Sequence, residues 1–324
     1  RRHGFTGLGK RALGFYATAS GVMLAKRAEP MIVIAKKSGQ LANRLFLFAH
    51  FIAFAEEHGV RVMNPAFDEY CRYFLSTVKD PLCRYPPGNP LVTNPRMSRI
   101  TYGAIQRVLR LWERAEMKSR HMEVISIDLN GNCNMADPMF VELAKRRKLL
   151  LIRGWNFRNH DVFNKHADTI RKYFIPLEKH RNNVVSVISK AREGCDILIG
   201  VHIRQGDYAK FRNGIYLYET TRYAKLMGQV TALFEGKRVG FLVCSNAEQD
   251  RGHFPDLEVA YSTNHLVEDL YGLTGCDLIM GPPSTYSMWA SFYGRVPLYI
   301  IEKANAAPTR GGFEVFEESA KYSY

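Results

Sequence analysis

The chain has 324 residues, 46% of them hydrophobic, and its 45 Lys and Arg against 31 Asp and Glu leave a formal net charge of +14. This length suffices for two domains of ordinary size, each with its own core. The charge predicts an anionic partner, which is nucleic acid, a phospholipid surface or a phosphorylated substrate, and charge alone does not choose among them.

Residues 1–30 form a basic segment with six Lys and Arg and a single acid. Its apolar run, 12–25, is too short to span a bilayer. We expect a peripheral extension, a basic segment that lies on an anionic membrane surface, or a trimmed leader. No later stretch approaches 18 apolar residues in a row, so the sequence predicts no membrane span.

The cysteines are scattered and include no CxxC pair, which argues against a zinc ribbon or a redox motif. Several lie in apolar runs, so we expect reduced, buried thiols in a cytoplasmic protein that contacts membranes only peripherally. The six are Cys71, Cys83, Cys133, Cys195, Cys244 and Cys276.

The pattern after residue 30 predicts two series of alternating strands and helices. In the first, a strand (31–35), a glycine turn, a helix with apolar residues at helical spacing (41–55) and a strand (60–65) follow one another. Residues 64–140 are less regular and rich in proline. A strand (148–155) and a helix (164–173) close this series.

A basic stretch, 96–120, interrupts the irregular region with seven cations against two acids. Its pattern predicts a helix from Ile105 onward. The helix either presents a phosphate-facing or membrane-facing surface, or is a solvated helix face.

The second series follows a charged segment, 178–193. We expect an α/β protein with two Rossmann-like domains that face a central cleft: 31–190 on the acceptor side and 191–324 on the donor side. The predicted strands of the second series are 197–204, 239–245, 258–263, 277–281 and 296–302, and its helices are 219–236, 265–275 and 285–294.

Polar residues collect where the predicted strands end, and ligands of open parallel sheets bind beyond those ends. Gly39 allows close backbone approach at the first strand, and Asn43 lies on the next helical turn. After the strand that begins at residue 197, pleating places His202 and Arg204 on the same side. Arg204 has the forked donors that suit phosphate, and Asp207 is able to orient it; the alternatives are a structural ion pair of these two residues or a metal site of His202 and Asp207.

Two further strand ends carry hydroxyl and amide groups. Ser245 and Asn246 are suited to hydrogen-bond a base or ribose. Ser284, followed by Thr285 and Ser287, opens a helix whose N-terminus either is simply capped or holds a phosphate. The sequence has no D-x-D, P-loop, GxGxxG, HExxH or GxSxG motif, so the chemistry left is a metal-free diphosphate site.

Four segments in order resemble the α-1,2-fucosyltransferases of glycosyltransferase family 11 and their relatives in the fucosyltransferase superfamily. They are SGQLANRLFLFAHFIAFA, RGWNFRNHDVF, GVHIRQGDY and LYGLTGCDLIMGPPSTYSMWASFYG, between residues 31 and 301. Three positions depart from the family pattern: Gln205 replaces its second signature arginine, Arg44 follows Asn43 in place of glutamine, and Ala290 replaces an aromatic residue.

The resemblance implies a two-domain GT-B-type fold and metal-independent, inverting transfer of fucose from GDP-fucose to a glycan hydroxyl, with no cofactor. It implies that Arg204 holds the diphosphate with Asp207 orienting it, and that His202 lies near the nucleoside. It also implies phosphate contacts from Ser284, Thr285 and Ser287, guanosine contacts from Ser245, Asn246 and Asp269, and cleft contacts from Gly39 and Asn43.

Several alternatives stay open at this stage. Another nucleotide sugar could be the donor, or the chain could be a non-catalytic glycan-binding or nucleic-acid-binding protein; its aromatic residues are not interleaved with Lys and Arg as in RNA-binding patterns. Glu219, His160 and Asp161 are candidate bases, and the leaving phosphate is the alternative proton acceptor. Arg44 either restores the lost positive charge or points to solvent.

Overall fold

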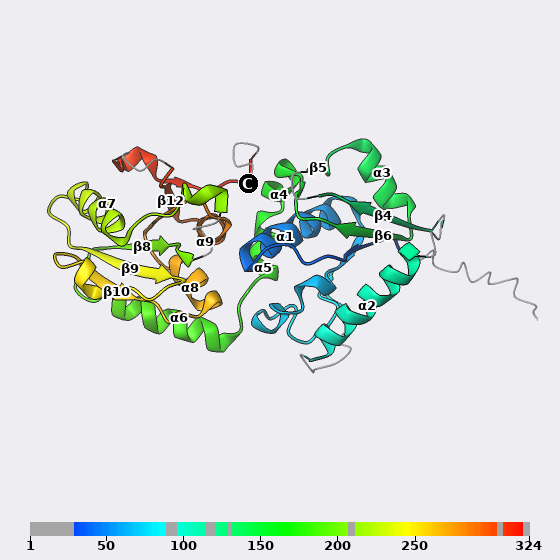
Figure 1. The fold of residues 1–324 in the computed structure, drawn as a ribbon, viewed down its shortest axis with the longest axis horizontal. Helices are drawn as coiled ribbons and strands as arrows, with labels where there is room; N and C mark the ends of the chain where they lie inside the picture. The colour runs from blue at the N-terminus through cyan, green and yellow to red at the C-terminus, as the bar shows by residue number, and fades with distance from the viewer. Residues whose placement is uncertain are drawn as a thin grey trace, which may run out of the picture.

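The computed structural model describes residues 29–88, 96–114, 119, 121–128, 131–206, 211–302 and 307–319. These residues form two α/β units, each built on a mainly parallel sheet (Figure 1). The first unit lies on the right of that view and the second on the left. This is the architecture that the alternation of predicted strands and helices implies.

The first sheet has the order β3-β2-β1-β6-β4, with β1 at its centre. β1 is parallel to β2 on one side and to β6 on the other, and only β3 runs antiparallel. The central strands are nearly continuous apolar runs because both faces of the sheet are covered. The strands are β1 (Met31–Ile34), β2 (Arg61–Met63), β3 (Arg84–Tyr85), β4 (Met122–Ser126) and β6 (Leu149–Arg153); β5 (Cys133–Asn134) and β7 (Phe157–Arg158) form a separate pair.

The second sheet has the order β10-β9-β8-β11-β12-β13. β8 is parallel to both β9 and β11, so the chain order reverses direction across the sheet at β8. In such sheets a crevice opens beyond the carboxyl end of the strand where the order reverses. The strands are β8 (Ile197–Ile203), β9 (Val239–Ser245), β10 (Glu258–Tyr261), β11 (Leu278–Gly281), β12 (Pro297–Ile300) and β13 (Glu314–Val315).

Helices cover both sheets and fill the space between the two units. The helices are α1 (Leu41–His58), α2 (Arg96–Arg114), α3 (Pro138–Arg146), α4 (His160–Lys165), α5 (Ala167–Tyr173), α6 (Glu178–Ala191), α7 (Thr220–Ala232), α8 (Leu266–Leu273) and α9 (Thr285–Gly294). Short 3-10 turns are η1 (Pro65–Phe67), η2 (Cys71–Tyr73), η4 (Phe211–Gly214), η5 (Arg251–His253) and η6 (Arg310–Gly312).

Helix α1 is buried on almost every side. Thirteen of its residues are buried, because one face covers the first sheet and another meets α9 of the second unit. A helix that is apolar all round is stable only in such a position. The helix ends at Gly59, which adopts the left-handed conformation expected of this cap.

A row of aromatic rings joins the two units. The ring of Phe174 lies 5.6 Å from Phe48 and 5.4 Å from Trp289, and Trp289 lies 5.2 Å from Phe46, measured between ring centroids. Phe316, near the end of the described chain, also packs on Phe46 at 5.8 Å. One hydrophobic core therefore extends from the first unit into the second, which fixes the geometry of the cleft between them.

Several elements differ from the sequence expectation. The predicted helix 164–173 is two helices, α4 and α5, and the irregular region 64–140 contains β4, β5 and the start of α3. Helix α2 begins at Arg96 and not at Ile105, and the charged segment before the second series is itself a helix, α6. α6 packs against α8, β9 and β10, so it covers the second sheet although its sequence is mostly polar.

Other expectations concern membranes and thiols. None of the helices within the described ranges is long and apolar enough to cross a bilayer. The expected basic extension falls almost entirely on residues 1–28, which lie outside the described residues. All six cysteines are free thiols, and four of them are buried.

Candidate functional site

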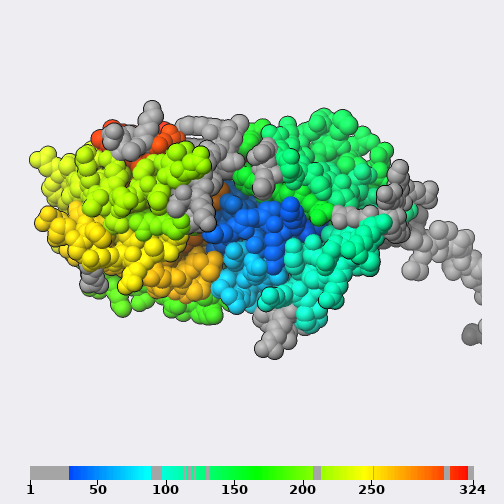
Figure 2. Space-filling view, viewed as in Figure 1, coloured from blue at the N-terminus to red at the C-terminus, as the bar shows by residue number. Residues whose placement is uncertain are grey.

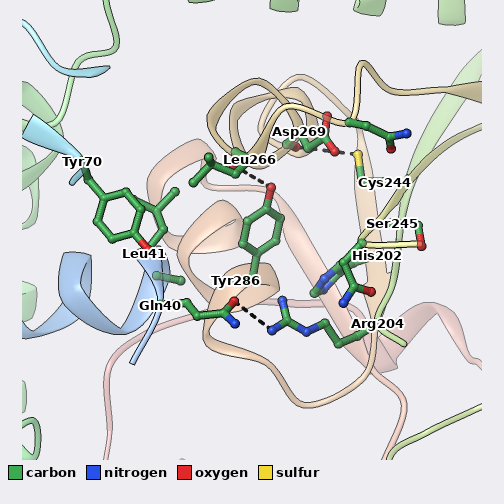
Figure 3. Close-up of a pocket in the computed structure, with 13 residues that line it drawn as sticks. Gln40, Leu41, Tyr70, His202, Arg204, Cys244, Ser245, Leu266, Asp269 and Tyr286 are labelled. Atoms are coloured by element: carbon green, nitrogen blue, oxygen red, sulfur yellow. Dashed lines mark hydrogen bonds between the residues drawn. The ribbon is translucent and has the colours of Figure 1, made fainter. Parts of the chain in front are cut away.

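A cavity of about 220 Å³ opens between the two units, beyond the carboxyl ends of β1 and β8 (Figure 3). This is the place that the reversal of strand order at β8 predicts for a ligand. Its lining residues are Gln40, Leu41, Ala42, Tyr70, His202, Arg204, Cys244, Ser245, Asn246, Asn264, Leu266, Asp269 and Tyr286.

Arg204 reaches across the cavity from the second unit to the first. It follows the end of β8, and its Nη2 donates a hydrogen bond to Gln40 Oε1 over 3.0 Å (Figure 3). Gln40 is the residue before α1 and makes no side-chain cap to that helix. The arginine therefore faces the N-terminus of α1. The guanidinium is positively charged and the helix N-terminus carries a partial positive charge, so the two together favour binding of an anion.

His202 is the buried neighbour of Arg204 on the same face of β8, as pleating predicts. A hydrogen bond of 2.8 Å joins its Nδ1 to Ser287 Oγ on α9, and the ring of Tyr286 lies 4.9 Å away. Burial, and after it the charge of Arg204, lowers the pKa of His202 to about 3. The imidazole is therefore neutral at physiological pH and acts as a hydrogen-bonding group, not as a cation.

Gly281, the last residue of β11, makes this close packing possible. A Cβ at this position would lie 3.0 Å from His202 Cβ, 3.1 Å from its carbonyl oxygen and 3.2 Å from Ser287 Oγ. A larger residue here would force the backbone of His202 or the hydroxyl of Ser287 to move by a few tenths of an ångström.

Asp269 lines the opposite wall, on the first turn of α8. Burial raises the pKa of its carboxyl to about 6, although nearby hydrogen-bond donors such as the Thr263 hydroxyl lower it. Burial thus disfavours the carboxylate form of this side chain. A ligand that offers N–H donors would favour the carboxylate form.

Asn246 fixes the ends of β8 and β9 to each other. Its side chain accepts from the Gln205 amide at 2.8 Å and donates to the Gln205 carbonyl at 3.0 Å. The Gln205 side chain bonds to Thr220 at 3.3 Å and to Gln249 at 3.2 Å, and it does not line the cavity. The residue that replaces the family's second arginine is therefore part of a structural network behind the cavity.

The loop before α1 is held to the second unit by Asn43. Thr285 Oγ1 donates to Asn43 Oδ1 over 2.6 Å, which links the N-termini of α9 and α1. Gly39 has a φ of +63°, and a Cβ there would lie 2.2 Å from Asn43 Nδ2, so this turn requires glycine.

Arg44 neither faces the cavity nor points to solvent. Its side chain is 11% exposed and donates to Gly39 O at 3.1 Å and to Glu69 Oε2 at 2.8 Å. It also lies over the ring of Tyr70, 5.0 Å from the centroid. Since Glu69 compensates its charge, Arg44 supports the loop and Tyr70 instead of supplying a second cation for a phosphate.

The predicted site residues fall into three groups. His202, Arg204, Ser245, Asn246 and Asp269 line the cavity. Gly39, Asn43, Ser284, Thr285 and Ser287 lie directly behind its wall, where Ser284 caps α9 by accepting from Tyr286 N at 3.3 Å. Asp207 lies outside the described residues, so neither the ion pair nor the metal site that involved it is described.

Sequence patterns missed most of the apolar and aromatic lining, which is Leu41, Ala42, Tyr70, Leu266 and Tyr286, and also the polar Asn264. The sequence did indicate the position of Gln40, because this residue directly follows Gly39 in a loop that we predicted to lie at the site. Tyr70 lies in the irregular region with no motif around it. None of the candidate bases lines the cavity among the described residues: His160 Nδ1 lies 3.4 Å from Glu318, Asp161 is on the first turn of α4, and Glu219 precedes α7.

One cluster of residues in the described ranges has the composition of a metal site: His180, His265 and Glu268, with donor atoms within 4.8 Å of one another. His180 Nδ1 already bonds to Glu268 at 2.7 Å, and His265 Nδ1 accepts from the N-terminal amides of α8. The two imidazoles stack at 4.7 Å and 23°, so their in-plane lone pairs run nearly side by side and do not converge on one ion. We interpret the cluster as a support for the start of α8.

Comparison of the sequence with models of known families gives no match, and neither does comparison with curated proteins. Solved structures do match. Fucosyltransferase FUT1 of Arabidopsis thaliana, a point mutant in complex with GDP, has a TM-score of 0.55 and 13% identity over 89% of this chain and 73% of that chain. POFUT1 in complex with GDP-fucose has a TM-score of 0.51 and 12% identity over 83% of this chain and 95% of that chain.

At such low identity the likeness shows the fold and nothing finer. The predicted GT-B-type fold, with two α/β domains and a cleft between them, is confirmed. This chain thus shares the two-domain fold of the FUT1 and POFUT1 structures.

Proposed function

We propose that this protein is a glycosyltransferase that transfers fucose from GDP-fucose to a hydroxyl group of a glycan acceptor. One observation carries the proposal: Arg204, neutral His202 and the buried carboxyl of Asp269 meet in one cavity of a fold shared with fucosyltransferases that bind GDP and GDP-fucose. A cation, a neutral hydrogen-bonding ring and a carboxyl match the diphosphate, the ribose and the guanine of a GDP sugar in chemical type.

In this proposal Arg204 and the N-terminus of α1 hold the diphosphate, with the N-terminus of α9 supporting the wall behind them. Asp269 accepts hydrogen bonds from the guanine base, and Ser245 and Asn246 lie beside it on the nucleoside side. The cavity of about 220 Å³ is smaller than the roughly 300–1,000 Å³ of ordinary small-molecule sites. The contact between Arg204 and Gln40 therefore has to open before a nucleotide sugar binds.

We propose an inverting, metal-independent reaction without a cofactor. The acceptor oxygen attacks the anomeric carbon, the bond from that carbon to the diphosphate oxygen breaks, and GDP leaves with the electron pair. Negative charge grows on the diphosphate in the transition state, where a fixed arginine stabilises it more than in the bound substrate. We assign no protein base, because the candidate bases do not line the cavity. In an inverting displacement the leaving phosphate lies on the opposite face of the sugar from the acceptor, so the proton of the acceptor hydroxyl passes to solvent or, once the bond from the anomeric carbon to the diphosphate has broken, to the departing GDP.

We propose an α-1,2 linkage, for which the sequence motifs are the only support. We also propose that the first domain, including Tyr70, forms the acceptor side of the cleft. We further propose that the protein works in the cytoplasm. These finer assignments depend on the donor reaction and are tested after it.

The decisive experiment measures GDP release and fucosylated product from GDP-fucose with a mixed glycan acceptor set, with and without EDTA. We expect activity in both conditions. In parallel, thermal shifts with GDP, UDP and ADP report the base preference: a shift with UDP alone would replace GDP-fucose by a uridine sugar. No shift with any nucleotide, together with salt-resistant binding of an oligonucleotide, would support a non-catalytic basic protein instead.

A further inference from the structure

Helix α2 has two apolar faces, and only one of them serves the core. The inner face covers the first sheet, where Leu109 is buried against Val33, Ala35 and Leu151. Gln106 also donates from its side chain to the Ala35 carbonyl. The fold of the first domain therefore accounts for the inner face of the helix.

The outer face carries three large apolar side chains in water. Ile100 is 61% exposed, Val108 62% and Leu111 64%. On a helix with 100° per residue these three positions lie within a stripe about 80° wide, with Ala104 between them. The space-filling view shows the teal segment that contains α2 uncovered along the first domain (Figure 2). Burial in the core of this chain does not explain this stripe.

A row of arginines borders the stripe on one side. The exposed residues Arg99, Arg107, Arg110 and Arg114 lie within about 80° of one another, next to the apolar residues. Over the described ranges of the chain none of the four makes an ion pair with a carboxylate; Arg110 bonds only to the Gln106 carbonyl of its own helix, at 3.3 Å. The charge of the row is therefore available to an external anion.

We propose that the outer face of α2 docks this protein on the surface of an anionic lipid bilayer. Apolar side chains beside a row of cations are the combination that binds at the headgroup boundary, where the stripe enters the acyl region and the arginines meet lipid phosphates. The net charge of +14 adds long-range attraction to the same surface.

Two other occupants fit less well. A second copy packed on this face would add another arginine row to the same interface, and repulsion between the like charges would oppose the contact. A nucleic acid would neutralise the arginines but leave Ile100, Val108 and Leu111 in water. Only the bilayer satisfies both parts of the surface, and this inference does not depend on the proposed sugar transfer.

The test is co-flotation of the full chain with vesicles of phosphatidylcholine alone or with 30% phosphatidylglycerol, at physiological salt. The first variant, Ile100→Ser with Val108→Ser and Leu111→Ser, should weaken binding to the anionic vesicles by at least about tenfold, since interfacial binding scales with the apolar area inserted. The second, Arg107→Gln with Arg110→Gln, should weaken it about 25-fold, because each cation near an anionic surface contributes about fivefold.

A matched control replaces exposed apolar residues elsewhere: Met139→Ser, Val185→Ser and Val315→Ser, which are 79%, 63% and 40% exposed. We expect this variant to bind like the wild type. Circular dichroism and the midpoint of thermal unfolding without ligand monitor folding of every variant. Three results with vesicles would overturn the proposal: equal binding to both vesicle types, no binding to either, or equal loss of binding in the control and in the α2 variants. The proposal would also fail if the protein bound an oligonucleotide or dimerised through the α2 face, as shown by loss in the α2 variants, and did not bind vesicles.

Discussion

Arg204 Nη2 and Gln40 Oε1 form a hydrogen bond of 3.0 Å between the two domains. The second polar link at the cleft, between Thr285 and Asn43, is 2.6 Å long. Both links join the start of a helix in one domain to a strand end or helix start in the other. The contact with Gln40 thus occupies the arginine that we propose binds the diphosphate, so nucleotide binding and this link between the domains compete for the same donor.

Substitution of Arg204 should weaken both nucleotide binding and turnover. A charge-assisted hydrogen bond contributes about 1.5–3 kcal/mol, so Arg204→Ala should lower GDP affinity by about 10- to 150-fold. Arg204→Lys keeps the charge without the forked donors, so its GDP affinity should lie between that of the wild type and that of Arg204→Ala. Calorimetric titration with GDP checks this. Arg238→Ala is the matched control, because Arg238 forms an exposed ion pair with Asp196 away from the cleft.

Removal of the Gln40 side chain should have the opposite effect on GDP affinity. Gln40→Ala removes a competitor for Arg204, so GDP should bind about 2- to 10-fold more tightly, the equivalent of one ordinary hydrogen bond. Fluorescence titration with a labelled GDP measures the change. Weaker binding would mean that Gln40 itself contacts the nucleotide, and would contradict the competition that we infer.

Asp269 should make GDP affinity depend on pH. Its pKa of about 6 means that the carboxyl is protonated below pH 6 and loses the acceptor that a guanine base needs. Affinity should therefore rise between pH 5 and 7 with a midpoint near 6. His202, with a pKa of about 3, does not titrate in this range. Calorimetry across pH tests this, and Asp269→Asn should give a flat profile; an unchanged profile in that variant would exclude Asp269 as the titrating group.

The same carboxyl should affect the stability of the protein without ligand. Because its pKa is raised from 3.8 to about 6 on folding, the native state binds more protons than the unfolded state between these values. The contribution of Asp269 to the free energy of unfolding is therefore present at low pH and falls by about 3 kcal/mol as the pH rises through 6. Urea unfolding measures the free energy of unfolding of the wild type and of Asp269→Asn at pH 4.5 and pH 7. We expect the stability of the wild type, relative to that of the variant, to be lower at pH 7 than at pH 4.5.

Ser287 should contribute to stability through His202. Ser287→Ala leaves the buried Nδ1 of His202 without its partner, which costs about 1–3 kcal/mol of unfolding free energy. Urea denaturation measures this cost. The control is Ser186→Ala, at an exposed position of α6, for which we expect a change below about 0.5 kcal/mol. Equal effects at the two positions would argue against a structural bond to His202.

Gln205 should not determine the choice of donor. Its side chain bonds to Thr220 and Gln249 behind the cavity, so Gln205→Ala should change GDP affinity by less than about threefold and leave the order of GDP, UDP and ADP unchanged. Thermal-shift titrations with the three nucleotides check this. A change of base preference would show that Gln205 reaches the ligand.

The sequence by itself determined the local elements of the second domain. β9 and α9 have the bounds that their letters predict, because a buried parallel strand is a continuous apolar run and the start of α9 is marked by Ser284. The position of Arg204 at a strand end, on the same face as His202, also followed from pleating alone. Helix α6 was not visible in this way, since its side chains are mostly polar and it is stabilised by contacts with α8, β9 and β10.

Only the tertiary structure decided which residues of the first domain complete the cavity. Gln40 and Tyr70 share one cavity with Arg204 because Phe46 of α1 packs on Trp289 of α9, and this contact joins residues far apart in the chain. The same packing decided that Arg44 pairs with Glu69, not with a ligand. Periodicity reports the face that a residue presents within its own element, whereas the partner of that face depends on how the elements pack.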